Sequence, residues 1–178
     1  MALVSLGLGA LIAFALIYAV SYATNRAASR SATTLASTAL VGQRIKGFTS
    51  PGLFGGTVSA PWSSGHPSVL IFFASWCGPC QGEMPKVAAW VRTHHLGDVR
   101  VLGVDANDQQ GAARRFVTQD KVGFPVAFDA SGNLTAGLFQ FQTLPETVFL
   151  TRTGRVLSVH FGPIASAQLA AGVSSLGA

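Results

Sequence analysis

The chain's only two cysteines, Cys77 and Cys80, stand between a run of apolar residues and a predicted helix. Residues 69–74 are continuously apolar, as in a strand buried on both faces, and residues 82–91 have helical spacing. This order places Cys77 at a helix N-terminus, where unpaired N–H groups and aligned peptide dipoles stabilise a thiolate. Cys80 follows one turn later on the same face. The pair can therefore cycle between dithiol and disulfide, which predicts thiol–disulfide exchange.

A lone C-x-x-C pair also occurs in zinc sites and in structural disulfides. A zinc site needs four ligands, usually from a second pair of cysteines or histidines. No such spacing is seen among the four histidines, which are His66, His94, His95 and His160. A structural disulfide across so short a loop constrains the unfolded chain little. We therefore expect a redox pair, with no metal and no bound cofactor.

The segment around the cysteines, residues 73–85 (FASWCGPCQGEMP), resembles the active site of thioredoxin-like proteins, in particular the membrane-anchored TlpA/ResA/CcmG (DsbE) branch. Residues 144–150 (LPETVFL) resemble the cis-proline segment of that branch and its following strand, and residues 154–162 resemble its final hairpin. The resemblance covers residues 41–178. It implies an α/β thioredoxin-like fold, with a central mixed β-sheet flanked by helices and preceded by one N-terminal transmembrane helix.

The resemblance also implies roles for the residues around the cysteines. Cys77, more exposed and nearer the helix end, is the expected nucleophile, and Cys80 is the resolving thiol that releases the reduced substrate. Gly78 and Pro79 set the turn and the helix start, and a Gly-Pro pair in this family usually belongs to a reducing protein. Trp76 is expected to shield the edge of the site, although a core aromatic is the alternative.

A second part of the site is implied at Leu144 and Pro145. A cis bond there exposes the backbone of Leu144 for pairing with a substrate, and an ordinary trans proline is the alternative. Thioredoxin carries a buried aspartate six residues before its first cysteine, where this chain has Ile71. Glu83 is the nearest substitute for taking a proton from the resolving thiol. A solvated carboxylate on the helix surface explains Glu83 equally well.

The N-terminus has the character of a membrane anchor. Residues 2–23 carry no charge and span about 33 Å as a helix, which matches a bilayer core. The small residues Ser21 and Ala23 fit a signal-peptidase site, yet the length of the apolar stretch and the lack of a preceding basic residue favour an uncleaved anchor. We therefore expect an anchor or signal-like segment at 1–23, a linker at 24–43 and the thioredoxin-like domain at 44–178. A helix extension is the alternative to the linker.

The charges after the anchor conflict with the family resemblance. The basic residues Arg26, Arg30, Arg44 and Lys46 all follow it, and the positive-inside rule then keeps the domain cytoplasmic. The resemblance implies the opposite side, which we favour because a tethered exchanger acts where disulfides form. The expected location is the cell membrane, with a single pass and an extracytoplasmic catalytic domain. Formal charge is +5 without an extended basic run, so nucleic-acid binding gains no support.

The rest of the chain alternates between strand and helix patterns, which predicts a central sheet covered on both faces. The expected elements are a hairpin of 45–48 and 56–59, strands at 69–74, 99–105 and 125–128, a helix at 109–120, a hairpin of 146–150 and 156–160, and a closing helix at 165–176.

Together these features predict a membrane-tethered thiol–disulfide oxidoreductase that reduces extracytoplasmic proteins and receives electrons from a membrane donor of the thiol-transfer type. Glu146 follows Pro145 as in relatives of the cytochrome-maturation type, so apocytochrome c is the leading substrate, although a surface glutamate also explains Glu146. One alternative is a general extracytoplasmic protein-disulfide reductase. Another is a thioredoxin-fold copper-delivery protein with Cys77, Cys80 and His160 as ligands, although such proteins use C-x-x-x-C.

Overall fold

The structure of the chain is a computed structural model that describes residues 14–22, 40–141 and 143–177. Its folded unit is Leu40–Ala178. In chain order the elements are β1 (Thr49–Pro51), β2 (Thr57–Ser59), a 3₁₀ turn (Pro61–Ser64), β3 (Ser68–Phe73), α2 (Gly78–Thr93), β4 (Arg100–Ala106), α3 (Gln110–Gln119), β5 (Val126–Asp129), a π-helical turn (Asn133–Leu138), β6 (Glu146–Leu150), β7 (Val156–Phe161) and α4 (Ser166–Ser175).

The main sheet has the strand order β5-β4-β3-β6-β7. Strands β3, β4 and β5 are parallel, whereas β6 and β7 run antiparallel to their neighbours. Every residue of β3 is buried, which explains why this central strand is continuously apolar. The structure thus confirms the predicted thioredoxin-like α/β fold with a central mixed sheet.

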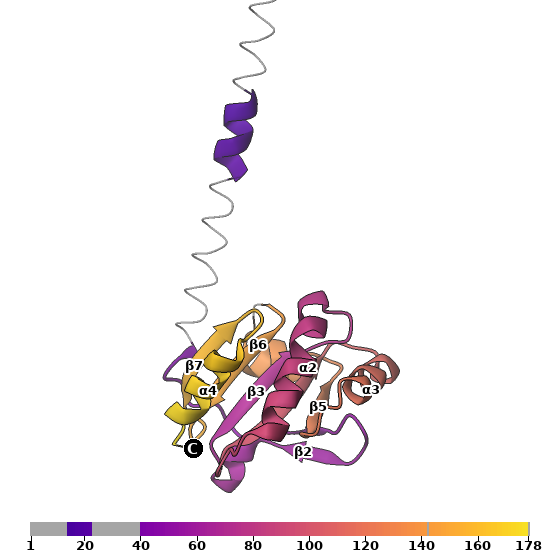
Figure 1. The fold of residues 1–178 in the computed structure, drawn as a ribbon, viewed down its shortest axis with the longest axis vertical. Helices are drawn as coiled ribbons and strands as arrows, with labels where there is room; N and C mark the ends of the chain where they lie inside the picture. Colours follow the sequence, from indigo (N-terminus) through magenta and orange to yellow (C-terminus); the bar gives the residue numbers. More distant parts are fainter. Residues whose placement is uncertain (1–13, 23–39, 142, 178) are drawn as a thin grey trace, which may run out of the picture. The chain divides into compact units, whose positions relative to one another are not determined.

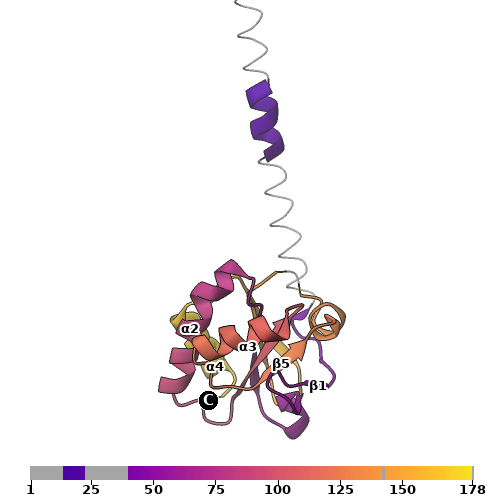
Figure 2. The same ribbon diagram turned by 90° about the vertical axis from the view of Figure 1, so that its right-hand side faces the viewer.

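The sheet carries a separate apolar core on each face. Helices α2, α3 and α4 gather against one face (Figures 1 and 2), and their buried residues pack with alternate side chains of β3. The other face is covered by residues 40–62 and by the π-helical turn. Because both faces of the sheet are covered, reactive side chains can reach solvent or a substrate at the ends of the strands.

The strand register brings three separate loops to one end of the sheet. The carboxyl end of β3 pairs Phe73 with Asp105 of β4. The antiparallel strand β6 starts at the same end, where Glu146 pairs with Phe72. The loop that enters α2, the loop between β4 and α3, and the Leu144–Pro145 bond therefore lie near one another.

Two predicted elements differ from the structure by more than one residue. The first hairpin strand is β1 at Thr49–Pro51 rather than 45–48, because Ile45 packs into the core and its N–H donates to the carbonyl of Gly154 at 2.8 Å. Helix α2 begins at Gly78, the helix start that the family resemblance implied, and so extends before the helical spacing read at 82–91. Proline suits the first turn of a helix, where its missing N–H costs nothing, so Pro79 starts α2 rather than delaying it.

The N-terminal predictions fall mostly outside the described residues. Within the predicted anchor, residues 14–22 are helical, whereas 2–13 and 23 are not described. No helix among the described residues has the length and hydropathy of a bilayer span. Residues 24–39 of the predicted linker are not described either. Its last four residues, 40–43, lie in the folded unit, where Leu40 is buried and the Gly42 N–H donates to the Val156 carbonyl at 2.9 Å.

The packing of α4 on the sheet requires a glycine at position 172. A Cβ atom at Gly172 would overlap the buried ring of Phe149 in β6. We expect Gly172→Ala to lower the free energy of unfolding by about 1–3 kcal/mol, as overpacking does. Gly111 in α3 is the matched control, because its Cβ would meet only the end of the flexible Arg115 side chain, at 3.6 Å.

Urea unfolding followed by circular dichroism measures both variants. Gly111→Ala is expected to raise the free energy of unfolding by up to about 1 kcal/mol, since alanine restricts the unfolded chain. A Gly172→Ala midpoint at or above that of the wild type would contradict the close packing of α4 on Phe149.

Candidate active site

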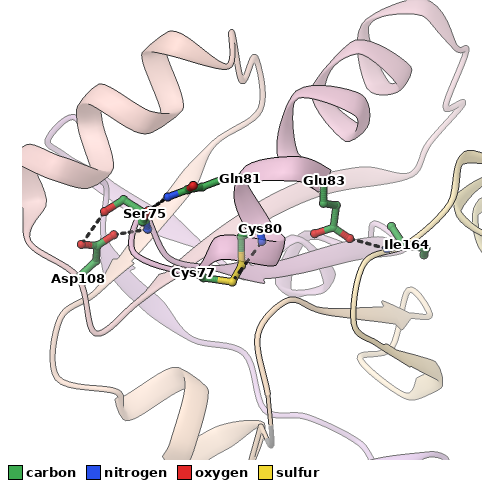
Figure 3. Close-up of a disulfide and its surroundings, with 7 residues drawn as sticks. All are labelled: Ser75, Cys77, Cys80, Gln81, Glu83, Asp108 and Ile164. Atoms are coloured by element: carbon green, nitrogen blue, oxygen red, sulfur yellow. Dashed lines mark hydrogen bonds between the residues drawn. A yellow bond between two sulfur atoms is a disulfide. The ribbon is translucent and has the colours of Figure 1, made fainter.

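The two cysteines occupy the N-terminus of α2, as predicted (Figure 3). Cys77 is the N-cap residue, with an extended backbone (φ −81°, ψ 105°), and it forms a disulfide with Cys80. The Cα atoms of the pair are 5.2 Å apart. The N–H of Cys80 donates to Cys77 Sγ at 3.2 Å. A thiolate on Cys77 would receive this hydrogen bond and the positive end of the helix dipole.

The two sulfurs differ in access in the expected order. Cys77 is 4% exposed and Cys80 is fully buried, so only Cys77 presents any surface to another protein. Trp76 is 61% exposed, and its indole N–H donates to the carbonyl of Asn107 at 3.1 Å. The core-aromatic alternative for Trp76 is therefore wrong.

The Leu144–Pro145 bond is cis, as the family resemblance implied. Leu144 is half-buried and packs against the apolar cluster that contains both cysteines. Glu146, which follows the proline, is fully buried, so its interpretation as a surface glutamate is wrong. The segment thus lies at the end of the sheet that carries Cys77.

Glu83 is buried rather than solvated, which excludes its interpretation as a surface carboxylate. It is 2% exposed, and its Oε1 accepts a hydrogen bond from the backbone N–H of Ile164 at 2.6 Å (Figure 3). Burial raises the pKa of Glu83 to about 7, against the lowering effect of that hydrogen bond. A carboxyl group one turn after Cys80 with this pKa can exchange protons at neutral pH.

Two further carboxyl groups, Asp105 and Asp108, lie at the same end of the sheet, and the sequence interpretation missed both. Asp105 is fully buried in β4, and burial, followed by its interactions with Asp108 and Asp129, raises its pKa to about 8. Asp108 is 8% exposed and accepts hydrogen bonds from Ser75, two residues before Cys77. An acidic residue inside an otherwise apolar strand was the available signal for Asp105.

Asp105 should make stability fall as the pH rises. Its pKa is about 8 in the folded protein against 3.8 for a solvated aspartate side chain, so the folded state keeps a proton that the unfolded state releases between these values. The stabilisation is complete below about pH 4 and is lost as the pH rises through 8. We expect Asp105→Asn to gain stability relative to the wild type between pH 5 and pH 9.

Urea unfolding of both proteins at pH 5, 7 and 9 tests this expectation. Glu83, whose pKa is also raised, remains in both proteins and contributes equally to each pH profile. Parallel profiles for the wild type and Asp105→Asn would show that Asp105 does not carry the extra proton.

The proposed copper ligands are not brought together. Among the residues that the structure describes, no three His, Cys, Asp or Glu side chains form a group suited to a metal ion. His160 lies on β7, where its Nε2 is 3.3 Å from the carbonyl oxygen of Pro163.

In sequence and in structure the chain is similar to known proteins of thiol–disulfide exchange. Residues 41–159 match the model of the AhpC/TSA family. The sporulation thiol-disulfide oxidoreductase A of Bacillus subtilis is 27% identical over 118 residues, which are 65% of this chain and 70% of that protein. ResA of Halalkalibacterium halodurans, a thiol-disulfide oxidoreductase, is 27% identical over 126 residues, which are 71% of each chain.

Two further proteins extend the comparison to the DsbE and DsbF type. A thiol:disulfide interchange protein DsbE homolog of Paracoccus denitrificans is 34% identical over 94 residues, or 52% of this chain and 49% of that protein. The solved structure of MTB DsbF, in mixed oxidised and reduced forms, superposes with a TM-score of 0.65 at 32% identity, covering 72% of this chain and 94% of that one. With its cysteine pair at a helix N-terminus, the chain therefore belongs to the AhpC/TSA family and is a thioredoxin-fold thiol–disulfide oxidoreductase of the ResA and DsbE type.

Proposed function

We propose that this chain is a membrane-tethered reductase of extracytoplasmic protein disulfides and that apocytochrome c is its substrate. The observation that carries the reductase assignment is the placement of Cys77 at the N-cap of α2, with the buried Glu83 one turn beyond Cys80. This placement supplies both a stabilised thiolate for attack and a base for the resolving thiol. Similarity to a DsbE homolog and the buried Glu146 after Pro145 support the choice of substrate.

The reaction proceeds in two exchanges. The Cys77 thiolate attacks one sulfur of the substrate disulfide; that bond breaks, a mixed disulfide forms, and the other substrate sulfur leaves as a thiolate. Cys80 then loses its proton to Glu83 and attacks Cys77 Sγ. This step forms the Cys77–Cys80 disulfide and releases the second substrate thiol. A membrane donor of the thiol-transfer type returns two electrons to the enzyme.

Substrate docking is assigned to the Leu144–Pro145 segment. The segment shares the strand end with Cys77, and Leu144 packs against the cluster that holds both sulfurs. An extended peptide bearing a disulfide would pair with the Leu144 backbone and present a sulfur to Cys77. Trp76, Gly78 and Pro79 form the rim and the turn of this site.

The choice of substrate is tested by comparing two oxidised proteins. The purified full chain is supplied with dithiothreitol and either an apocytochrome c with its C-x-x-C-H disulfide or insulin. We expect kcat/KM for the apocytochrome to exceed that for insulin at least tenfold, a preference of about 1.4 kcal/mol. Equal values would favour the general protein-disulfide reductase instead.

The location is tested by labelling intact cells. After mild reduction, a membrane-impermeant thiol reagent should modify Cys77 if the domain lies outside the cytoplasm. Carbonate extraction of the membranes tests the tether made by residues 2–23. Labelling only after lysis would place the domain inside, as the basic residues after the anchor suggest by the positive-inside rule.

A further inference from the structure

The loop between β4 and α3 holds the two residues that precede Cys77. Asp108 Oδ2 accepts the backbone N–H of Ser75 at 2.5 Å, and Oδ1 accepts the Ser75 hydroxyl at 3.0 Å (Figure 3). The neighbouring Asn107 accepts the indole N–H of Trp76. Asn107 has a φ of 49°, a left-handed conformation that asparagine tolerates. The two loop residues thus contact successive residues of the chain that enters α2.

All the polar groups of Ser75 form hydrogen bonds with residues outside its own loop. Its N–H and hydroxyl bond to Asp108, and its carbonyl accepts the side-chain amide of Gln81 at 2.9 Å. Asp108 also accepts a hydrogen bond from the N–H of Gln109 at 2.6 Å. Three donor groups therefore fix the orientation of its carboxylate. Because Asp108 is 8% exposed, water competes little for these charge-assisted hydrogen bonds.

We propose that Asp108 is a positioning residue for thiol–disulfide exchange. Its hydrogen bonds to Ser75 hold Cys77 Sγ at the N-cap of α2. This inference rests on the proposed role of Cys77 as the nucleophile. The thiolate is stabilised at the N-cap only while Cys77 keeps its extended conformation and its sulfur faces the Cys80 N–H. Ser75 lies two residues before Cys77, and its hydrogen bonds to Asp108 fix the position of Ser75.

Positioning and charge act on the Cys77 thiol in opposite directions. A carboxylate near a thiol disfavours the thiolate, so removing the Asp108 charge by itself would lower the thiol pKa and speed alkylation. Releasing Ser75 instead weakens the N-cap interaction, which raises the thiol pKa and slows alkylation at neutral pH. The sign of the change therefore separates the two effects.

The experiment measures alkylation of Cys77 by iodoacetamide from pH 5 to pH 10 in the full chain carrying Cys80→Ser, which leaves one thiol. In that background we expect Asp108→Ala to slow alkylation about tenfold at pH 7, with rates that converge on the parent at pH 10, where the thiol is ionised. Ser75→Ala, which removes only the hydroxyl contact, should slow it two- to threefold. Asp98→Asn is the control, because Asp98 is a partly exposed carboxylate paired with His66 and Arg152.

Melting temperatures of all variants are measured in parallel. A lowered melting temperature with an unchanged alkylation profile would overturn the proposal, because Asp108 would then only support the fold. Faster alkylation of Asp108→Ala would also overturn it, since charge alone would then account for the effect. If Asp108→Ala does not fold, Ser75→Ala, which keeps the Asp108 charge, decides the matter by the same criteria. Failure of the proposed function appears separately, as disulfide reduction that survives Cys77→Ser.

Discussion

Cys77→Ser is expected to abolish reduction of protein disulfides, whereas Cys80→Ser is expected to accumulate mixed disulfides with its targets. The reason is the unequal placement of the sulfurs: Cys77 caps α2 and presents surface, while Cys80 is fully buried behind it. Without Cys77 no thiolate reaches the substrate. Without Cys80 the attack still occurs, but no second thiol resolves it.

Insulin reduction measures the loss, and non-reducing electrophoresis with mass spectrometry identifies the trapped species. The two substitutions are matched, since each removes one sulfur from the same pair. Multiple turnover by Cys80→Ser, or trapping by Cys77→Ser, would reverse the assignment of nucleophile and resolving thiol.

Glu83→Gln is expected to slow release of substrate from the mixed disulfide about 100-fold at pH 7, the usual contribution of a general base. Burial raises the pKa of Glu83 to about 7, so in the wild type this step should accelerate as the pH rises through 7 and Glu83 becomes ionised. In Glu83→Gln the step should instead depend on direct loss of the Cys80 proton to solvent, which needs a higher pH than ionisation of Glu83. The two rates therefore approach each other at high pH.

Stopped-flow measurements with a disulfide substrate separate the attack from the resolving step. The attack by Cys77 should change little, because glutamine keeps the shape of Glu83 and its amide oxygen can accept the Ile164 N–H. Asp98→Asn controls for loss of one negative charge at a distance. An unchanged pH profile for the resolving step in Glu83→Gln would show that Glu83 takes no part in the reaction.

The local order of the chain was predictable because it depends on residues adjacent in sequence. The apolar run at 69–74 became β3, and the strand predicted at 146–150 has the same bounds as β6. Both are buried strands with few polar residues, so their patterns have no competing interpretation. The N-terminal hairpin was misplaced because Ile45, read as a strand residue, packs into a core whose other members come from distant parts of the chain.

The sequence by itself determined the redox pair and its place at a helix N-terminus, because these follow from spacing along one strand and one helix. The fold around the pair was implied by the resemblance of residues 73–85 and 144–150 to thioredoxin-like proteins. Only the tertiary structure decided which carboxyl groups near that pair are buried. Glu83 accepts a hydrogen bond from the N–H of Ile164, 81 residues away, and Asp108 accepts one from the N–H of Ser75, 33 residues away. Burial and charge–charge proximity set the pKa of a carboxyl group, and both depend on which segments the sheet brings together rather than on neighbours in sequence.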